Sequence, residues 1–252
     1  EDQPVIRNEE INQIGIIELE NVSYQYPSNK KWVLKDINLI IKQGEKLALV
    51  GENGAGKSTL IKLILGFYKP TRGRILIDGK DLKDIDKRSY QNKISAVFQD
   101  FVRYNLSIRE NVALGNIDKM MDDTRIRDVL CIINAEDILG GNENVDQLLG
   151  RLNEGGRDLS GGQWQKIAMC RALYRDYDLI ILDEPTASID TSAEVELFKK
   201  FIKLSDGFTC IFISHRLGWA KQANRIVVLH QGSIIEQGNH QELMKTNALI
   251  LK

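Results

Sequence analysis

The sequence predicts an α/β fold, in which a mostly parallel sheet flanked by helices carries an N-terminal antiparallel β subdomain and an inserted α-helical subdomain. Three observations predict this class. The buried-strand pattern of Lys46–Val50 runs into the glycine-rich stretch Gly51–Thr59 and then into the helical pattern of Leu60–Leu65. Short strand patterns recur on both sides of this unit. From 101 to 174 the strand patterns stop and helical periodicity replaces them.

The elements around the glycine-rich stretch are mostly strands. Ile16–Tyr24 alternates between apolar and polar residues, as a half-buried strand does. Ile37–Ile41 predicts another strand, which a Gln-Gly turn separates from the buried strand named above. Beyond the first helix, Arg74–Gly79 predicts a strand that ends in an Asp-Gly turn. Ile94–Phe98 predicts a short buried strand, and Gln99 follows it directly.

The glycine-rich stretch matches the pattern G-x-x-x-x-G-K-[ST] between a strand and a helix, which predicts a phosphate-binding loop. Its glycines allow backbone angles that other residues avoid, so several N–H groups can point toward a bound anion. Lys57 is expected to reach the β- and γ-phosphates, and the Ser58 hydroxyl to take one Mg²⁺ position. A glycine-rich turn that binds nothing is the alternative, but it leaves the flanking strand and helix unexplained. The expected nucleotide contacts are Gly51, Asn53, Gly54, Ala55, Gly56, Lys57, Ser58 and Thr59.

Helical patterns dominate the segment from 101 to 174. They are clearest in Ile108–Leu114 and in Arg125–Ile133, which follows the N-cap candidates Asp123 and Thr124. We interpret this segment as a helical lobe inserted into the α/β core.

A second glycine-containing stretch, Leu159–Gln163, precedes the helical pattern Trp164–Tyr174. Ser160 is a candidate N-cap, and Gly161 and Gly162 leave the amides of the first turn uncovered by side chains. These features suit a second anion site at a helix N-terminus, although a Ser-Gly-Gly sequence is also typical of an ordinary loop.

Two carboxylates follow the aliphatic run Leu179–Leu182, which predicts a central strand buried on both faces. The carboxyl ends of such strands are where open α/β sheets place ligands. Asp183 suits a carboxylate that holds Mg²⁺, and Glu184 suits the group that polarises an attacking water. The alternative is a pair of solvated strand-end carboxylates.

The last third of the chain predicts a helix over 193–203 and a strand over Thr209–Ile213, followed by His215. A histidine at a strand end is usually structural, but here it could donate a proton to a γ-phosphate oxygen. Arg225–Glu236 predicts a hairpin, and Gln241–Lys245 a short final helix.

Composition excludes several other functions. The net charge of −1 argues against general attraction to nucleic acid or anionic lipid, so we expect no nucleic-acid partner. The three cysteines, Cys131, Cys170 and Cys210, contain no C-x-x-C pair, which predicts buried thiols in a reducing compartment rather than zinc ligands.

Together these residues resemble the nucleotide-binding domain of ATP-binding-cassette (ABC) transporters, from about Ile16 to the C-terminus. The motifs occur in the order found in that family. They are the phosphate loop Gly51–Thr59, Gln99, the signature Leu159–Gln163, Asp183 with Glu184, the aspartate loop Ser188–Asp190 and the switch histidine His215.

The resemblance implies a P-loop NTPase core that binds ATP and Mg²⁺ and hydrolyses ATP. In this reading Lys57, Gln99, Glu184 and His215 are catalytic. Ser58, Gln99 and Asp183 hold the metal, and Tyr26 stacks on adenine, unless it is simply an amphipathic aromatic at a strand end. The signature lies more than a hundred residues beyond Lys57. The resemblance implies that Ser160, Gly161, Gly162 and Gln163 contact the ATP of a second copy in a head-to-tail homodimer.

Details of the sequence are similar to the exporter branch of the family. They include Glu154–Gly156, Arg109–Val112 and Ile213–Leu217, while Gln99–Tyr104 is similar to segments of bacterial lantibiotic and peptide exporters. The resemblance implies that residues 1–15 are a linker from a transmembrane domain and that 16–252 form the nucleotide-binding domain, with 101–174 as its helical subdomain. It also implies a location at the cytoplasmic face of the cell membrane.

Two alternatives share the same site chemistry. One is the free-standing ATPase subunit of an ABC importer, which the exporter-like segments argue against. The other is a non-transport ABC ATPase switch, for which a basic face or a second cassette would be expected.

Overall fold

The computed structural model describes residues 8–151, 155–184, 207–213 and 220–245. They form an α/β fold with an N-terminal antiparallel sheet, as predicted. The described residues fall into two compact units. The first comprises those within Glu1–Ile94, Tyr177–Ile181 and Gly207–Lys252, and the second those within Ser95–Asp176 and Leu182–Asp206.

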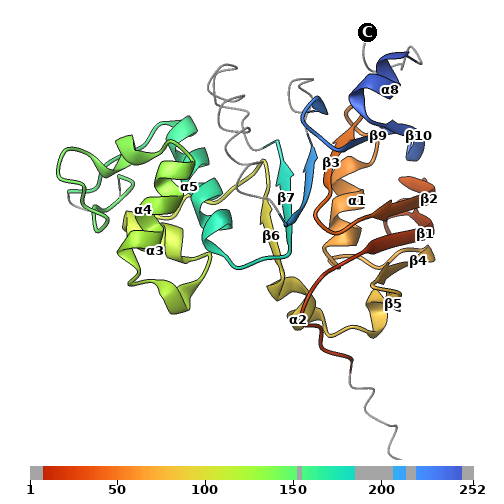
Figure 1. Cartoon of the computed structure of the whole chain (residues 1–252), viewed down its shortest axis with the longest axis horizontal. Coiled ribbons are helices and arrows are strands. Elements are labelled where there is room, and N and C mark those ends of the chain that lie inside the picture. The colour runs from red at the N-terminus through yellow and green to blue at the C-terminus, as the bar shows by residue number, and fades with distance from the viewer. Residues whose placement is uncertain (1–7, 152–154, 185–206, 214–219, 246–252) are drawn as a thin grey trace, which may run out of the picture. The chain divides into compact units, whose positions relative to one another are not determined.

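A four-stranded antiparallel sheet belongs to the first unit (Figure 1). Its strands, in spatial order, are β2 (Leu34–Ile41), β1 (Ile17–Tyr24), β4 (Arg72–Ile77) and β5 (Lys80–Asp81). β1 lies between β2 and β4 and pairs antiparallel with both. Asp78 and Gly79 have φ angles of 51° and 80°, which make the tight reversal between β4 and β5. The predicted Asp-Gly turn is therefore confirmed.

A second sheet has six strands in the order β10-β9-β3-β8-β7-β6. Their bounds are β3 (Lys46–Val50), β6 (Ile94–Val97), β7 (Leu179–Asp183), β8 (Thr209–Ile213), β9 (Arg225–His230) and β10 (Ser233–Gly238). β3 pairs in parallel with β8 and β9, and all five of its residues are buried. β9 and β10 form the predicted hairpin. β2 and β3 are joined by a turn but do not pair with each other. β2 pairs with β1 in the first sheet, whereas β3 lies in the second.

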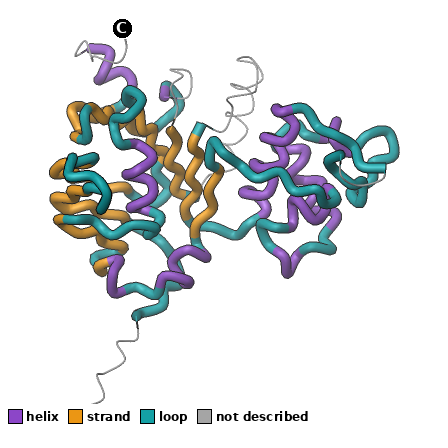
Figure 2. The backbone as a smooth tube through the Cα atoms, turned by 180° about the vertical axis from the view of Figure 1, so that it is seen from behind, coloured by secondary structure: helices purple, strands orange, loops and turns teal. Residues whose placement is uncertain are grey.

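The predicted helices that fall on described residues are present with small shifts, whereas a helix over Lys87–Asn92 was not predicted. Figure 2 shows the helices in purple. They are α1 (Lys57–Ile64), α2 (Lys87–Asn92), α3 (Ile108–Ala113), α4 (Asp123–Ile132), α5 (Gly161–Tyr174) and α8 (His240–Lys245), with 3₁₀ turns η1 (Leu82–Asp84), η2 (Ile117–Lys119) and η3 (Glu136–Leu139).

The predicted N-cap of α4 was wrong by one or two residues. The cap is Asp122, whose carboxylate accepts from the Arg125 N–H at 3.0 Å. Asp123 lies inside the helix and pairs with Arg109 instead, and Thr124 is also helical. Periodicity placed the helix correctly, but a contact with another element decided which carboxylate caps it.

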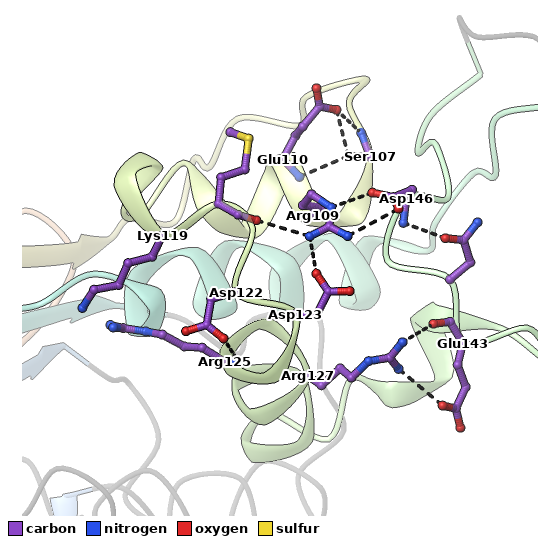
Figure 3. A network of polar contacts seen from close by, with 12 residues as sticks. Ser107, Arg109, Glu110, Lys119, Asp122, Asp123, Arg125, Arg127, Glu143 and Asp146 are labelled. Atoms are coloured by element: carbon purple, nitrogen blue, oxygen red, sulfur yellow. Dashed lines mark hydrogen bonds and ion pairs between the residues drawn. The ribbon is translucent and has the colours of Figure 1, made fainter.

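Arg109 on α3 joins three parts of the second unit (Figure 3). Its guanidinium pairs with Asp146 at 2.6 Å in the loop before the signature, and with Asp123 on α4. The hydrogen bond from Arg109 lowers the pKa of Asp123 below its ordinary value. Because the Arg109 side chain is only 13% exposed, these pairs lose less to solvent screening than fully exposed ones do. They tie α3 and α4 to the loop that leads toward α5.

The cysteines correct one expectation. Cys170 and Cys210 are buried as predicted, and burial raises the pKa of the Cys210 thiol to about 12. Cys131, in contrast, is exposed near the end of α4. Within the described ranges, no group of three or more His, Cys, Asp or Glu side chains is arranged to hold a metal ion. Likewise, no helix in the described part of the chain is long and apolar enough to cross a bilayer.

Several predictions lie outside the described residues. They are the helix over 193–203, the aspartate loop Ser188–Asp190, the switch histidine His215, and the exporter-like segments at Glu154 and 214–217.

A buried asparagine organises the start of the helical region. Asn111 on α3 is 0% exposed. Its amide nitrogen lies 3.0–3.2 Å from the carbonyl oxygens of Tyr104, Leu106 and Ser107. Its own oxygen atoms accept from the guanidinium of Arg171 on α5, each at 3.1 Å. Asn111 therefore bonds to polar groups of the preceding loop, of α3 and of α5.

We expect Asn111→Ala to lower the free energy of unfolding by about 3 kcal/mol, because it leaves buried carbonyl oxygens and a guanidinium without this amide. The measurement is urea unfolding followed by circular dichroism. The exposed Asn142→Ala is the matched control and should change stability by less than about 0.5 kcal/mol. Equal stabilities of the two variants would contradict the assignment.

Candidate functional site

The predicted phosphate loop connects β3 to α1 in the first unit. Gly51, Gly54 and Gly56 have φ angles of 154°, 80° and 106°. These values favour glycine, as the motif required. Gly56 is the N-cap residue of α1, and the Leu60 N–H donates to its carbonyl at 2.9 Å. The loop thus ends at a helix N-terminus, where the backbone N–H groups of the first turn and the helix dipole favour an anion.

Two of these glycines are also required by close contacts. A Cβ atom on Gly51 would lie 2.2 Å from the carbonyl oxygen of Leu229 on β9. A Cβ on Gly56 would lie 2.8 Å from the Leu34 side chain on β2. At Gly54 a Cβ would meet nothing within 4 Å. The loop is therefore packed against β9 and β2 at its two ends and open at Gly54.

Lys57 folds back over the loop. Its ammonium group donates to the carbonyl oxygens of Gly51 at 2.6 Å and Glu52 at 3.0 Å, and the residue is only 7% exposed. A largely buried cation beside a glycine-rich loop suits a phosphate group. Ser58 is exposed at the start of α1, where its hydroxyl oxygen could serve a hard cation such as Mg²⁺.

Tyr26 lies next to the phosphate loop, although it precedes Gly51, where the loop begins, by 25 residues in the sequence. Its hydroxyl is 3.1 Å from the hydroxyl of Thr59. Its ring makes edge contacts with Tyr24 and Tyr68, with ring centroids 5.1 and 5.7 Å apart. The structure therefore brings together the predicted adenine-contacting aromatic and the predicted phosphate loop.

Asp183 is the last residue of β7 and Glu184 follows it. Both belong to the second unit and are half-buried. Glu184 has a φ angle of 49°, in the left-handed region that non-glycine residues usually avoid. Such a conformation costs on the order of 1–3 kcal/mol and persists only where surrounding contacts hold it. Gln99 belongs to the same unit and is exposed two residues after the end of β6.

Sequence reasoning missed Gln165 on α5. This residue is 2% exposed, and its amide nitrogen lies 3.4 Å from the carbonyl oxygen of Glu184. The contact is long for a hydrogen bond, but it joins the helix of the signature to the strained backbone of Glu184. The sequence held no distinct signal for it, because the neighbouring Lys166 is also polar and lies between the same two apolar residues, Trp164 and Ile167.

Ser160 is the N-cap of α5, as predicted. Its hydroxyl oxygen accepts from the Gln163 N–H at 3.2 Å, and the Gln163 side chain accepts from the Ser160 N–H at 3.0 Å. These two bonds form a capping box, which satisfies two N–H groups at the helix start. Ser160 and Gly161 are exposed, so the N-terminus of α5 is open to a ligand or a partner.

The site residues divide between the two units. Tyr26 and 51–59 belong to the first unit, whereas Gln99, 160–163, Asp183 and Glu184 belong to the second. The first group suits phosphate and an aromatic base, and the second holds carboxylates and a further helix N-terminus.

A model of the family described as ABC transporter matches residues 34–187, which is more than half of the chain. The chain belongs to the ABC transporter family. The matched range contains the phosphate loop, the signature and the strand-end carboxylates of this ABC domain.

Curated ABC relatives agree with this assignment. The subtilin transport ATP-binding protein SpaT of Bacillus subtilis is 44% identical over 243 residues, covering 96% of this chain and 40% of that protein. The nisin transport ATP-binding protein NisT of Lactococcus lactis subsp. lactis is 43% identical over 233 residues, covering 92% of this chain and 39% of that protein. The chain thus spans about two fifths of the length of these relatives.

A solved ABC structure has the same fold. It is that of a bacterial Atm1-family ABC exporter with ATP bound, with a TM-score of 0.87 and 28% sequence identity. The match covers 100% of this chain and 43% of the other.

We expect Gly51→Ala to destabilise the first unit more than Gly54→Ala, because only Gly51 meets a backbone oxygen. Strain at positive φ alone should cost Gly54→Ala about 1 kcal/mol in free energy of unfolding, and the added clash should bring Gly51→Ala to about 3 kcal/mol or more. Thermal and urea unfolding of both variants test this. If positive φ alone explained the need for glycine, Gly51→Ala would destabilise the protein no more than Gly54→Ala does.

We expect Gln165→Ala to lower the rate of ATP turnover by about tenfold with little change in ATP affinity, because the backbone of Glu184 loses a contact that orients it. The matched control is Gln91→Ala, which also removes an amide that donates to a backbone carbonyl, that of Leu65 at 3.1 Å. Phosphate release and nucleotide titration separate the two effects. Normal turnover in Gln165→Ala would contradict this role.

Proposed function

We propose that this chain is the nucleotide-binding domain of an ABC exporter, which binds ATP and Mg²⁺ and hydrolyses ATP as a head-to-tail homodimer. The observation that carries the proposal is the phosphate loop, with three positive-φ glycines and with the Lys57 ammonium bound to the carbonyl oxygens of Gly51 and Glu52. A glycine-rich loop with a cation beside it suits an anion, and the family membership makes a nucleoside triphosphate the expected one.

The first unit would bind the nucleotide. The amides of 51–59 and the Lys57 ammonium would hold the phosphates, and the ring face of Tyr26 would stack on the adenine. The contact between Tyr26 and Thr59 supports this, because it keeps the aromatic ring beside the loop. Stacking reads a π-face rather than base edges, so we expect some tolerance for other purine nucleotides.

The second unit would supply the chemistry. Glu184 would accept a proton from, or polarise, the attacking water, and Gln99 would help to orient that water. His215 would donate a hydrogen bond to the γ-phosphate. Mg²⁺, when bound, would neutralise charge on the β- and γ-phosphates, and Ser58, Gln99 and Asp183 have the oxygen atoms that this ion prefers.

A second copy of the chain would complete each site. The exposed N-terminus of α5, with Ser160, Gly161 and Gly162, would contact the γ-phosphate of the ATP bound to the other copy. The capping box supports this, since it keeps the first turn of α5 formed and open. ATP would then join two domains, and its hydrolysis would release them.

The pairing of two copies would power export by a transmembrane domain, with this domain at the cytoplasmic face of the cell membrane. Residues 1–15 would be the linker to the transmembrane domain, 16–252 the ATP-binding domain and 101–174 its helical subdomain. The similarity to an ABC exporter structure and to two proteins named for subtilin and nisin transport supports this, and it favours a peptide cargo.

We expect Glu184→Gln to retain ATP binding, to form a more persistent ATP-dependent dimer and to lose about 100-fold or more of its turnover. Phosphate release and size-exclusion chromatography with Mg²⁺-ATP measure these properties. Glu136→Gln, at an exposed position on η3, is the matched control and should behave like the parent. Wild-type turnover in Glu184→Gln would refute the role of Glu184.

A further inference from the structure

The side chain of Gln163 is bound at both ends within its own chain. Its oxygen accepts from the Ser160 N–H at 3.0 Å, and its amide nitrogen donates to a carboxylate oxygen of Asp137 at 2.8 Å. We propose that Gln163 and Asp137 are a positioning pair that orients Ser160, and that Gln163 does not itself contact the nucleotide. The inference rests on the proposed function and changes the role expected for Gln163 from the sequence.

The capping box explains what the pair would orient. The Gln163 N–H donates to the Ser160 hydroxyl oxygen at 3.2 Å. This bond uses a lone pair of the oxygen, so the hydroxyl hydrogen is left to be donated to another acceptor. Because Ser160 is exposed, that acceptor can be a phosphate oxygen outside the chain. The Gln163 side chain holds the Ser160 backbone and the Gln163 N–H holds the Ser160 hydroxyl oxygen, so together they limit the directions in which Ser160 can donate.

Asp137 is well placed to act as an anchor for Gln163. It lies on η3, where its neighbours Ile138 and Leu139 are buried at 0% and 7% exposure. The guanidinium of Arg157 donates to the Ile138 carbonyl at 3.2 Å and thereby joins this turn to the segment before the signature. Lys166, one turn after the signature, lies 3.7 Å from the other oxygen of Asp137. The turn that carries Asp137 is thus held from two sides.

The hydrogen bond between Asp137 and Gln163 is charge-assisted, which makes it stronger than a bond between two neutral groups. Asp137 is half-exposed, with 54% of its side chain accessible, so the bond contributes through geometry more than through stability. A residue that acts in this way should affect function more than the unfolding transition.

Positioning and direct contact require different chemistry at position 163. A positioning residue needs an acceptor for the Ser160 N–H. It also needs a second polar atom that can pair with residue 137, with a donor on one side and an acceptor on the other. A direct contact needs the amide of Gln163 itself. Gln163→Glu keeps the acceptor and remains a capping-box residue, but it places a carboxylate against Asp137. Adding Asp137→Asn restores a donor and an acceptor with their directions exchanged.

The test compares Gln163→Glu, Asp137→Asn and the double variant. Turnover is measured with Glu184 intact. The ATP concentration at half-maximal dimerisation is measured with each change added to Glu184→Gln. We expect Gln163→Glu to raise that concentration and lower kcat by about tenfold, Asp137→Asn alone to stay within about threefold of the parent, and the double variant to recover to within about threefold. ATP affinity of the monomeric domain and the unfolding temperature should stay unchanged in all three, which separates positioning from a folding defect.

The inference is overturned if the double variant remains as impaired as Gln163→Glu, because the amide of Gln163 would then be needed directly. It is also overturned if Gln163→Glu behaves like the parent. If the single variant Glu184→Gln binds ATP but never dimerises, the proposed head-to-tail function is overturned together with this inference. That result is obtained before any change is made at position 163. The two failures are therefore distinguishable.

Discussion

The contact between the backbone at Gly51 and the carbonyl of Leu229 is the constraint on which the first unit depends. β3 is buried along its whole length between β8 and β9, so the chain leaves it directly beside the backbone of β9. No side chain fits at Gly51, where a Cβ would lie 2.2 Å from that carbonyl. Gly51 takes a φ angle of 154° there, which favours glycine, and its carbonyl oxygen accepts from the Lys57 ammonium. The phosphate-binding geometry follows from the packing of a central strand.

Helix α5 has a comparable place in the second unit. Its first turn carries the capping box of Ser160 and Gln163, its second turn carries Gln165 beside Glu184, and Arg171 near its end binds Asn111. The Arg171 guanidinium also lies 4.8 Å from the centre of the Tyr104 ring. Burial lowers the pKa of Arg171, yet the group is satisfied by oxygen atoms and an aromatic face. Helix α5 thus carries the end of the signature and contacts both the strand-end glutamate and Tyr104 in the segment after Gln99.

Local patterns were sufficient for most of the architecture. The apolar run of 179–182, the Asp-Gly turn and the serine before two glycines each have a physical meaning within a few residues, and the strand, the turn and the N-cap are present. Local patterns failed where several residues of one type compete. Three polar residues in a row could cap α4, and Asp122 does so because Asp123 is taken by Arg109. The exposure of Cys131 was likewise decided by which face of α4 packs against its neighbours.

The sequence by itself determined the family, the order of the elements and the residue types of the site, because a phosphate loop and a capped helix N-terminus need particular residues at fixed short spacings. Only the tertiary structure decided that Gln165 meets Glu184, that Asp137 holds Gln163 and that Tyr26 lies against Thr59. These pairs are separated by 19, 26 and 33 residues. No periodicity within one element relates them, since each contact exists only after the two elements have packed together.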